Sequence, residues 1–257
     1  MQYFVTTINN KIATVTLNRP PANALSRGVI KELGAVLDEL ETNEEVRVII
    51  LKGEGRFFSA GADIKEFTSI ESEREFRQHG EYTQHLFERI ENFPKPVIAS
   101  VHGAALGGGL ELAMACHIRM VSDDAKLGLP ELTLGLIPGF AGTVRLPRYV
   151  GIAKAAEMLW TSEPISGIEA VKLGLANHAY PAEQLVEETQ KLAQKIALKS
   201  PISINATIEL LNLVKTDEYT KAVAREAELF GKVFSTEDGK EGVQAFIEKR
   251  QPHFKGK

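Results

Sequence analysis

Two short apolar runs constrain the fold of this chain more than any other feature. VRVIILKG spans residues 46–53 and KPVIASVHG spans residues 95–103. Both place β-branched and other apolar residues close together, which is typical of strands that are buried on both faces. The segment between them, residues 71–92, is charged and is predicted to form a helix. Strand, helix and strand in this order indicate an α/β core.

The rest of the chain extends this alternation. YFVTTINNKIATVTLNRP, at residues 3–20, predicts two strands around Asn9-Asn10, and Ser26 is placed to cap the helix that follows. A helix is expected to open in GGLELAMACH (108–117), a strand and a turn in 117–132, a helix over 151–162, and a short helix and a strand over 165–180. From residue 183 the pattern is helical, with a break near Ser200-Pro201. The sequence therefore predicts an α/β core in residues 1–195 and a helical region in residues 196–257.

Composition argues against several classes of function. The 257 residues carry a formal net charge of −4, unlike a protein that binds nucleic acid through its overall charge. The one cysteine, Cys116, cannot form an intramolecular disulfide and is expected to be buried, and no Cys/His spacing suits a metal. The N-terminus does not resemble a signal peptide, and no apolar stretch approaches the roughly 18 residues of a membrane span. We therefore expect a cytoplasmic protein without a metal and without a membrane partner.

Two glutamates stand in unusual surroundings. Glu111 lies between GGGL and LAMA, and Glu131 lies between LGLP and LTLGLIPG. Burial among apolar residues would raise the pKa of each carboxyl toward the range that serves acid–base catalysis. A simpler interpretation stands beside this one, because Glu111 in a first helical turn complements the helix dipole and Glu131 after a proline is an ordinary helix-start residue.

Glycines precede the first of these glutamates. A backbone N–H at a helix start has no partner within the helix, so Gly107-Gly108-Gly109 could present a donor to an anion or a developing oxyanion. The same glycines could instead allow close packing of a helix on a strand. SAGAD, at residues 59–63, is a second loop of small residues that could offer another donor. Two donors from two loops would form an oxyanion hole.

These segments together resemble a known family. SAGADIKEF, KPVIASVHGAALGGGLELAMACHIRM and LGLPELTLGLIPGFAGTVRLPRYVG, in this order, are similar to the crotonase, or enoyl-CoA hydratase/isomerase, superfamily. The resemblance implies a spiral of repeated ββα units followed by a helical C-terminal trimerisation region, with trimers that commonly pair into hexamers. It also implies an acyl-CoA thioester substrate. No cofactor is expected, because coenzyme A is part of that substrate.

The resemblance implies a role for several residues. Ala62 and Gly108 match the two backbone donors of the oxyanion hole, and Glu111 and Glu131 match both carboxylates of the hydratases. This points to a lyase of fatty-acid breakdown (β-oxidation) that adds water reversibly, with syn geometry, to a trans-2-enoyl-CoA and gives a 3-hydroxyacyl-CoA. Gly139 is expected to help position the water or Glu131. Coenzyme A is expected near Ala60 and Ile64, and near Phe246 and Lys249 of a neighbouring subunit, where the basic tail HFKGK could meet its phosphates.

Alternatives remain at this point. A 3,2-enoyl-CoA isomerase needs one carboxylate, and a branched-chain (methylglutaconyl-type) enoyl-CoA hydratase would share the fold. A non-enzymatic binding protein or an RNA-binding relative is a third alternative, against which the acidic net charge and both glutamates weigh. Two departures from the family pattern were noted. Phe140 is larger than usual and could narrow the acyl site, and a shortened LNRPPANALS leaves Arg19 without an assigned role.

Overall fold

The computed structural model describes residues 1–67, 72–214, 232 and 236–257. Its larger sheet has six strands in the order β1-β2-β3-β4-β6-β9, and a smaller sheet has the order β5-β7-β8. The larger sheet comprises β1 (Phe4–Asn9), β2 (Ile12–Leu17), β3 (Val48–Gly53), β4 (Val97–Val101), β6 (Ile118–Ser122) and β9 (His178–Tyr180). The smaller sheet comprises β5 (Ala104–Leu106), β7 (Lys126–Gly128) and β8 (Ile165–Ser166).

The two apolar runs form central strands of the larger sheet. β3 pairs in parallel with β2 and β4, and β4 pairs in parallel with β6. All five residues of β4 are buried, as the run predicted. The N-terminal hairpin is also confirmed, with Asn9 opposite Ile12 and with positive φ angles of 49° at Asn10 and 65° at Lys11. Two successive residues with positive φ match the right-handed twist of a hairpin.

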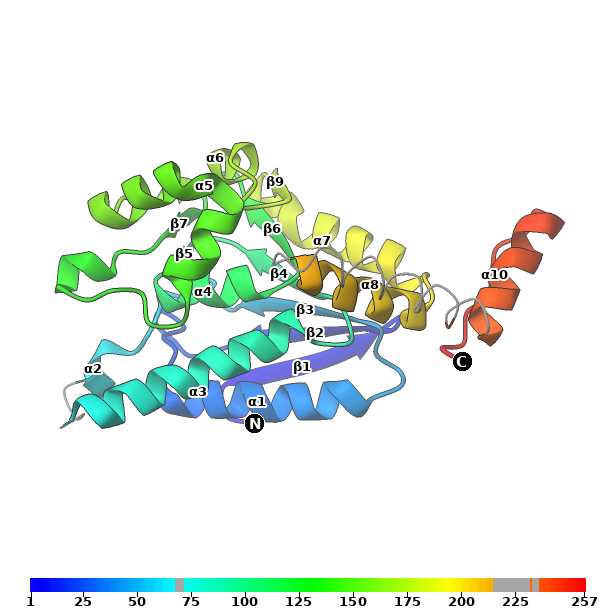
Figure 1. Ribbon diagram of the computed structural model, residues 1–257, viewed down its shortest axis with the longest axis horizontal. Helices are drawn as coiled ribbons and strands as arrows, with labels where there is room; N and C mark the ends of the chain where they lie inside the picture. Colours follow the sequence, from blue (N-terminus) through cyan, green and yellow to red (C-terminus); the bar gives the residue numbers. More distant parts are fainter. Residues whose placement is uncertain (68–71, 215–231, 233–235) are drawn as a thin grey trace.

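The chain follows a repeated path between the two sheets. After β4 it passes through β5 into α4 (Gly108–Ala115), and after β6 it passes through β7 into α5 (Gly142–Thr161). Isolated parallel bridges join Ser59 to Ala105 and Leu25 to Ala62, so the segment after β3 lies beside β5. This strand–strand–helix repeat is the predicted spiral, and its turns are stacked in Figure 1. The sequence did not reveal the short strands of the smaller sheet.

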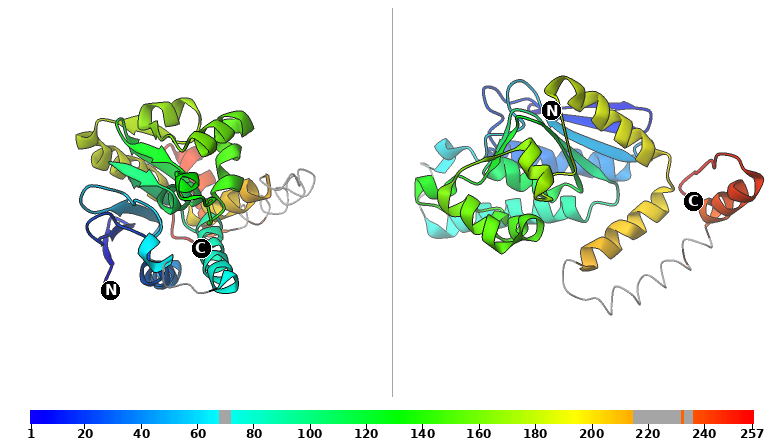
Figure 2. Two further views of the ribbon diagram at one scale, coloured as in Figure 1. Left: turned by 90° about the vertical axis from the view of Figure 1, so that its left-hand side faces the viewer. Right: turned by 90° about the horizontal axis from the view of Figure 1, so that it is seen from above.

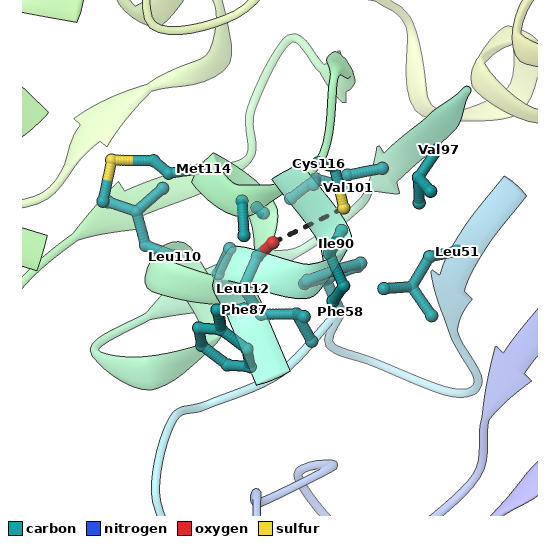
Figure 3. Close-up of a cluster of buried hydrophobic side chains, with 14 of the residues drawn as sticks. Leu51, Phe58, Phe87, Ile90, Val97, Val101, Leu110, Leu112, Met114 and Cys116 are labelled. Atoms are coloured by element: carbon teal, nitrogen blue, oxygen red, sulfur yellow. Dashed lines mark hydrogen bonds between the residues drawn. The ribbon is translucent and has the colours of Figure 1, made fainter. Parts of the chain in front are cut away.

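Helix α4 lies inside the protein. All eight of its residues are buried, and Figure 3 shows its side chains packed against Phe58, Phe87 and strands of the larger sheet. Cys116, which follows α4, is 2% exposed, and its thiol donates to the Leu112 carbonyl at 3.4 Å. Burial raises the pKa of this thiol to about 12, so it stays protonated at neutral pH. Cys116 is therefore the buried small residue that the sequence predicted.

Two helices flank this core on the side of the N-terminal hairpin. They are α1 (Arg27–Thr42) and α3 (Glu73–Glu91), and a short helix α2 (Ile64–Phe67) comes between them in the chain. Buried apolar residues of α1 recur at helical spacing, from Val29 through Leu33 and Val36 to Leu40. Ser26 is the N-cap of α1, as predicted, and its Oγ accepts the Val29 N–H at 3.3 Å.

Replacing Ser26 by alanine is expected to lower the free energy of unfolding by about 1 kcal/mol, because the Val29 N–H loses its partner in a buried position. Urea denaturation of Ser26→Ala measures this change. Ser26→Thr is the matched control, since it keeps a hydroxyl oxygen at the cap and should lose less. Equal losses in the two variants would contradict the capping explanation.

The C-terminal part is helical, as predicted. It comprises α6 (Gly167–Lys172), α7 (Ala182–Ala197), α8 (Pro201–Val214) and α10 (Glu237–Glu248), with the break between α7 and α8 at Ser200-Pro201. Helix α7 packs on β3, β4, β6 and β9, so the α/β core extends through this helix. No helix in the described ranges combines the length and the apolar composition needed to cross a bilayer.

The last residues fold back onto the body of the protein. The Asp238 carboxylate accepts the N–H groups of Lys255 at 2.6 Å and Gly256 at 3.0 Å, and the Ser200 hydroxyl donates to it at 2.9 Å. The Phe254 carbonyl accepts a hydrogen bond from Arg47 at 2.6 Å. The tail is thus tied to α10 and to the residue before β3. Figures 1 and 2 show α10 beyond α8, at the end of the molecule farthest from α2.

Candidate active site

A cavity of about 630 Å³ opens where three turns of the spiral meet. One side is formed by Ala60, Gly61, Ala62 and Ile64, a second by Gly107, Gly108 and Glu111, a third by residues between Pro130 and Phe140, and a fourth by Arg77, Gly80, Glu81 and Gln84 of α3. The structure therefore brings together Ala60, Ala62, Ile64, Gly108, Glu111, Glu131 and Gly139, all of which the sequence analysis had selected. Helix α3 therefore forms one wall of the cavity.

Backbone N–H groups of Ala62 and Gly108 face the same space. The bridge to Leu25 uses the Gly61 carbonyl and the Asp63 N–H, so the N–H of Ala62 points away from Leu25. Gly108 is the first residue of α4, where an N–H has no partner within the helix. A Cβ atom on Gly108 would lie 3.4 Å from the Ala62 nitrogen. The nitrogens of Ala62 and Gly108 therefore lie close together beside the cavity.

Glu111 is held by the start of another helix. Its side chain is 1% exposed, and its Oε1 accepts the N–H groups of Phe140 at 2.8 Å and Gly142 at 2.7 Å. Burial, with the nearby Glu131 carboxylate, raises the pKa of Glu111 to about 7. The two N–H bonds and the positive charge of Arg145 lower this pKa. Glu111 can therefore change its protonation state near neutral pH.

Glu131 faces this carboxyl from the turn after β7. It begins the short helix η1 (Glu131–Leu134), and a Cβ atom on Gly107 would lie 2.9 Å from its Oε1. Its Oε2 is buried and has no hydrogen-bond partner in the described part of the chain. Burial raises the pKa of Glu131 as well. Two carboxyls that interact in this way titrate as a pair.

Substituting Glu111 by glutamine is expected to change how stability depends on pH. The pKa of Glu111 is about 7 in the folded protein against 4.5 when unperturbed, so below pH 4.5 both states hold the proton and above pH 7 the fold contains a buried charge. Wild-type stability should therefore fall, relative to Glu111→Gln, by about 2–3 kcal/mol between pH 5 and pH 8. Urea denaturation at both pH values measures this difference.

A matched control for that experiment is Glu163→Gln, which removes an exposed carboxylate. It should leave the dependence of stability on pH unchanged. If Glu111→Gln and wild type differ by the same amount at pH 5 and at pH 8, Glu111 does not have a raised pKa in the folded protein.

The sequence did not reveal the donors that hold Glu111. They are backbone groups of Phe140 and Gly142, in the loop that Gly139 begins. Gly139 lines the cavity, and its carbonyl accepts a bond from Gln84 at 2.8 Å. The glycine at position 142 is the one feature of the sequence that reflects this contact, because a Cβ atom there would lie 2.8 Å from Glu111 Oε1.

Phe140 narrows the cavity beside the oxyanion donors. Its ring would lie 3.0 Å from a Cβ atom on Gly108, and it packs edge-on against Phe87 with ring centroids 5.8 Å apart. Arg19, which had no assigned role, bonds the Asp63 carboxylate at 2.6 Å and the Ala24 carbonyl at 3.0 Å. Arg19 thus supports the turn that carries Ala62.

The two C-terminal residues that were expected to contact coenzyme A lie in and just after α10. Phe246 lies in α10, and its side chain is outside the described residues. Lys249 follows α10, is exposed and has a φ of 55°. Helix α10 lies at the far end of the molecule from α2 (Figure 1), and Lys249 is not among the described residues that line the cavity. Among the described residues, no group of three or more His, Cys, Asp or Glu side chains is placed to hold a metal ion.

A spiral α/β fold whose cavity is lined by Ala62, Gly108 and the two carboxyls of Glu111 and Glu131 is typical of the crotonase-fold class of proteins. The family model for enoyl-CoA hydratase/isomerase matches residues 7–257, and the chain belongs to this family. It is 56% identical over 250 residues to a probable enoyl-CoA hydratase of Bacillus subtilis, with 97% of each chain covered. A short-chain-enoyl-CoA hydratase of Clostridium acetobutylicum is 42% identical, with 94% of this chain and 93% of that protein covered. The crystal structure of enoyl-CoA hydratase from Bacillus anthracis superposes with a TM-score of 0.95 at 37% identity, with 100% of each chain covered.

Proposed function

We propose that this protein is an enoyl-CoA hydratase that adds water to a trans-2-enoyl-CoA and forms a 3-hydroxyacyl-CoA. The observation that carries the proposal is the convergence of Glu111 and Glu131, both with raised pKa values, on a cavity that also presents the N–H groups of Ala62 and Gly108. An isomerase needs one proton-transferring carboxyl. The presence of two in one cavity favours hydration.

The two N–H groups activate the substrate. The thioester oxygen binds between Ala62 and Gly108, and these donors stabilise the negative charge that this oxygen gains when water attacks the double bond. Gly108 also lies at the N-terminus of α4, where the helix dipole favours negative charge. Loss of one such donor costs about 3–4 kcal/mol of transition-state stabilisation.

The carboxyls divide the proton transfers between them. Ionised Glu111 takes a proton from water as the hydroxyl adds at C3, and the double-bond electrons move toward C2 and the thioester oxygen. Protonated Glu131 then gives its proton to C2, which completes a syn addition if both carboxyls act from one face. Glu111 ends protonated and Glu131 ionised, so a proton must return from Glu111 to Glu131 through solvent before the next turnover.

Hydration of crotonyl-CoA tests this function directly. Loss of absorbance of the conjugated thioester should follow addition of the enzyme, and the product should be 3-hydroxybutyryl-CoA. A parallel assay with a 3-enoyl-CoA separates an isomerase, which would convert it faster than it hydrates crotonyl-CoA. A panel of longer and branched enoyl-CoAs then defines the acyl preference. No turnover of any of these thioesters would reject the proposal.

We propose further that copies of the chain associate in the cytoplasm as trimers, or as dimers of trimers, through the helical C-terminal region. Large apolar side chains are exposed there, with Leu198 72%, Leu211 64% and Val243 49% accessible. Burial of such side chains against another copy would stabilise the assembly. In this arrangement Phe246 and Lys249 would contact coenzyme A in a neighbouring subunit. Light scattering on the eluted protein measures the number of subunits, and a monomer would exclude the arrangement.

A further inference from the structure

The mechanism above gives no role to Arg145, a buried charge close to Glu111. Arg145 lies in the first turn of α5, and its side chain is 4% exposed. Its Nη2 bonds the Glu91 carboxylate at 2.9 Å, and its Nη1 donates to the Phe140 carbonyl at 2.6 Å. Its Nε is buried and has no hydrogen-bond partner in the part of the chain that the structure describes. Burying an arginine is unfavourable unless its contacts serve the fold or the site.

The Phe140 carbonyl belongs to the loop that holds Glu111. On the inner side of this loop, the N–H groups of Phe140 and Gly142 both point at Glu111 Oε1. Between them Ala141 has a left-handed conformation, with φ 70° and ψ 23°. A non-glycine residue adopts this conformation at a cost of about 1–2 kcal/mol and needs support from its surroundings. Arg145 supplies such support, because it holds the carbonyl of the peptide that joins Phe140 to Ala141.

We propose that Arg145 is a positioning residue for hydration, which fixes the Phe140–Ala141 peptide so that two N–H groups stay directed at the Glu111 carboxylate. This inference rests on the proposed function. Arg145 does not contact the reacting atoms, since the loop lies between its guanidinium and Glu111. Its effect on the reaction passes through the donors of Phe140 and Gly142.

The positive charge of Arg145 and its hydrogen bond to the loop both favour the ionised form of Glu111. It lowers the pKa of Glu111 against the effects of burial and of Glu131. Without Arg145, Glu111 would lose this attraction and its two N–H bonds would loosen, so its pKa should rise. A general base with a higher pKa is ionised in a smaller fraction of molecules at neutral pH. The acidic limb of the pH profile of kcat/KM should then move to higher pH.

The test compares Arg145→Gln, Arg145→Lys and the control Arg148→Gln, which removes an exposed charge from the same helix. We expect Arg145→Gln to lower kcat for crotonyl-CoA about 10- to 100-fold with KM nearly unchanged, and to raise the pKa of the acidic limb. Arg145→Lys keeps the charge and one donor and should recover part of kcat. Equal kcat and equal pH profiles in Arg145→Gln and Arg148→Gln would overturn the proposal.

A second comparison excludes a merely structural role. Arg145→Gln removes the ion pair with Glu91 and should lower stability, so the double variant Arg145→Gln/Glu91→Gln removes both charges together. The double variant should fold, and the pKa of the acidic limb of its kcat/KM profile should still be higher than in wild type. Glu91→Gln alone keeps the hydrogen bond from Arg145 to the Phe140 carbonyl and should leave the pKa of the acidic limb unchanged. If Glu91→Gln reproduces the kinetic change, the ion pair rather than the loop contact is responsible.

A readout without turnover keeps this inference separate from the proposed function. Titration of the ¹³C-labelled Glu111 carboxyl by NMR, assigned with Glu111→Gln, reports its pKa in wild type and in the Arg145 variants. A higher pKa in Arg145→Gln supports the positioning role even if no enoyl-CoA is hydrated, in which case only the proposed function fails. An unchanged pKa would reject the role of Arg145 whatever the activity.

Discussion

Replacing Glu131 by glutamine is expected to lower kcat for crotonyl-CoA hydration by about 10²- to 10⁴-fold, because the proton for C2 is lost. Glutamine keeps the size of the side chain, so the cavity should keep its shape and KM should change little. The Glu131 Oε2 is buried and unpaired in the described part of the chain, which leaves it available to bond a ligand in the cavity. Steady-state kinetics on Glu131→Gln measure the effect.

Glu163→Gln is the control for this experiment, since it makes the same chemical change at an exposed position outside the cavity. Its kcat should equal that of wild type. Retention of more than about a tenth of wild-type kcat in Glu131→Gln would show that another group supplies the proton. The N–H donors and Glu111 would then have to account for the whole reaction.

Gly108→Ala should be nearly as damaging, with kcat/KM lower by about 10²- to 10³-fold. The added Cβ would lie 3.4 Å from the Ala62 nitrogen and 3.0 Å from the Phe140 ring. A methyl group there occupies the space in which the thioester oxygen must meet both N–H groups. The main loss is expected in transition-state stabilisation, which isothermal titration with a nonreactive acyl-CoA separates from substrate binding.

Two further variants identify the origin of that loss. Gly34→Ala makes the same change within α1, where the new Cβ would meet Leu86 at an ordinary 3.6 Å, and it should leave kcat/KM unchanged. Gly108→Ala/Phe140→Leu relieves the contact with the ring but leaves the methyl group beside Ala62. Recovery of activity in this double variant would assign the defect to the displaced ring instead of to the oxyanion hole.

The strands of the larger sheet could be predicted because their signals are local. β3 and β4 are runs of apolar residues, and the cap of α1 needs only a serine at the right distance from a helical pattern. β5, β7 and β8 contain three, three and two residues, too few to display a period. They exist because the spiral brings them together, which is a property of the whole chain. Sequence patterns of this length cannot reveal them.

The residues of the site likewise differ in whether they leave a local signal in the sequence. Glu111 and Glu131 attracted attention because carboxylates are unusual among apolar residues, and both proved to line one cavity. Their proximity could not be derived from spacing, and it entered the sequence analysis only through resemblance to a family. The donors of Phe140 and Gly142 are backbone groups, which leave no mark on residue type except the glycine. The buried contact between Arg145 and the Phe140 carbonyl left no pattern at all.

The order of the three segments around the cavity has a consequence for synthesis on the ribosome. The loop at residues 60–64 emerges first, the start of α4 at residues 107–111 follows, and the loop at residues 130–142 comes last. A growing chain that has already packed α4 therefore contains Glu111 before its two N–H partners have emerged. Until Gly142 folds into place, the carboxyl must remain hydrated or protonated. Glu111 therefore gains its two N–H partners only after residues 140–142 have been synthesised.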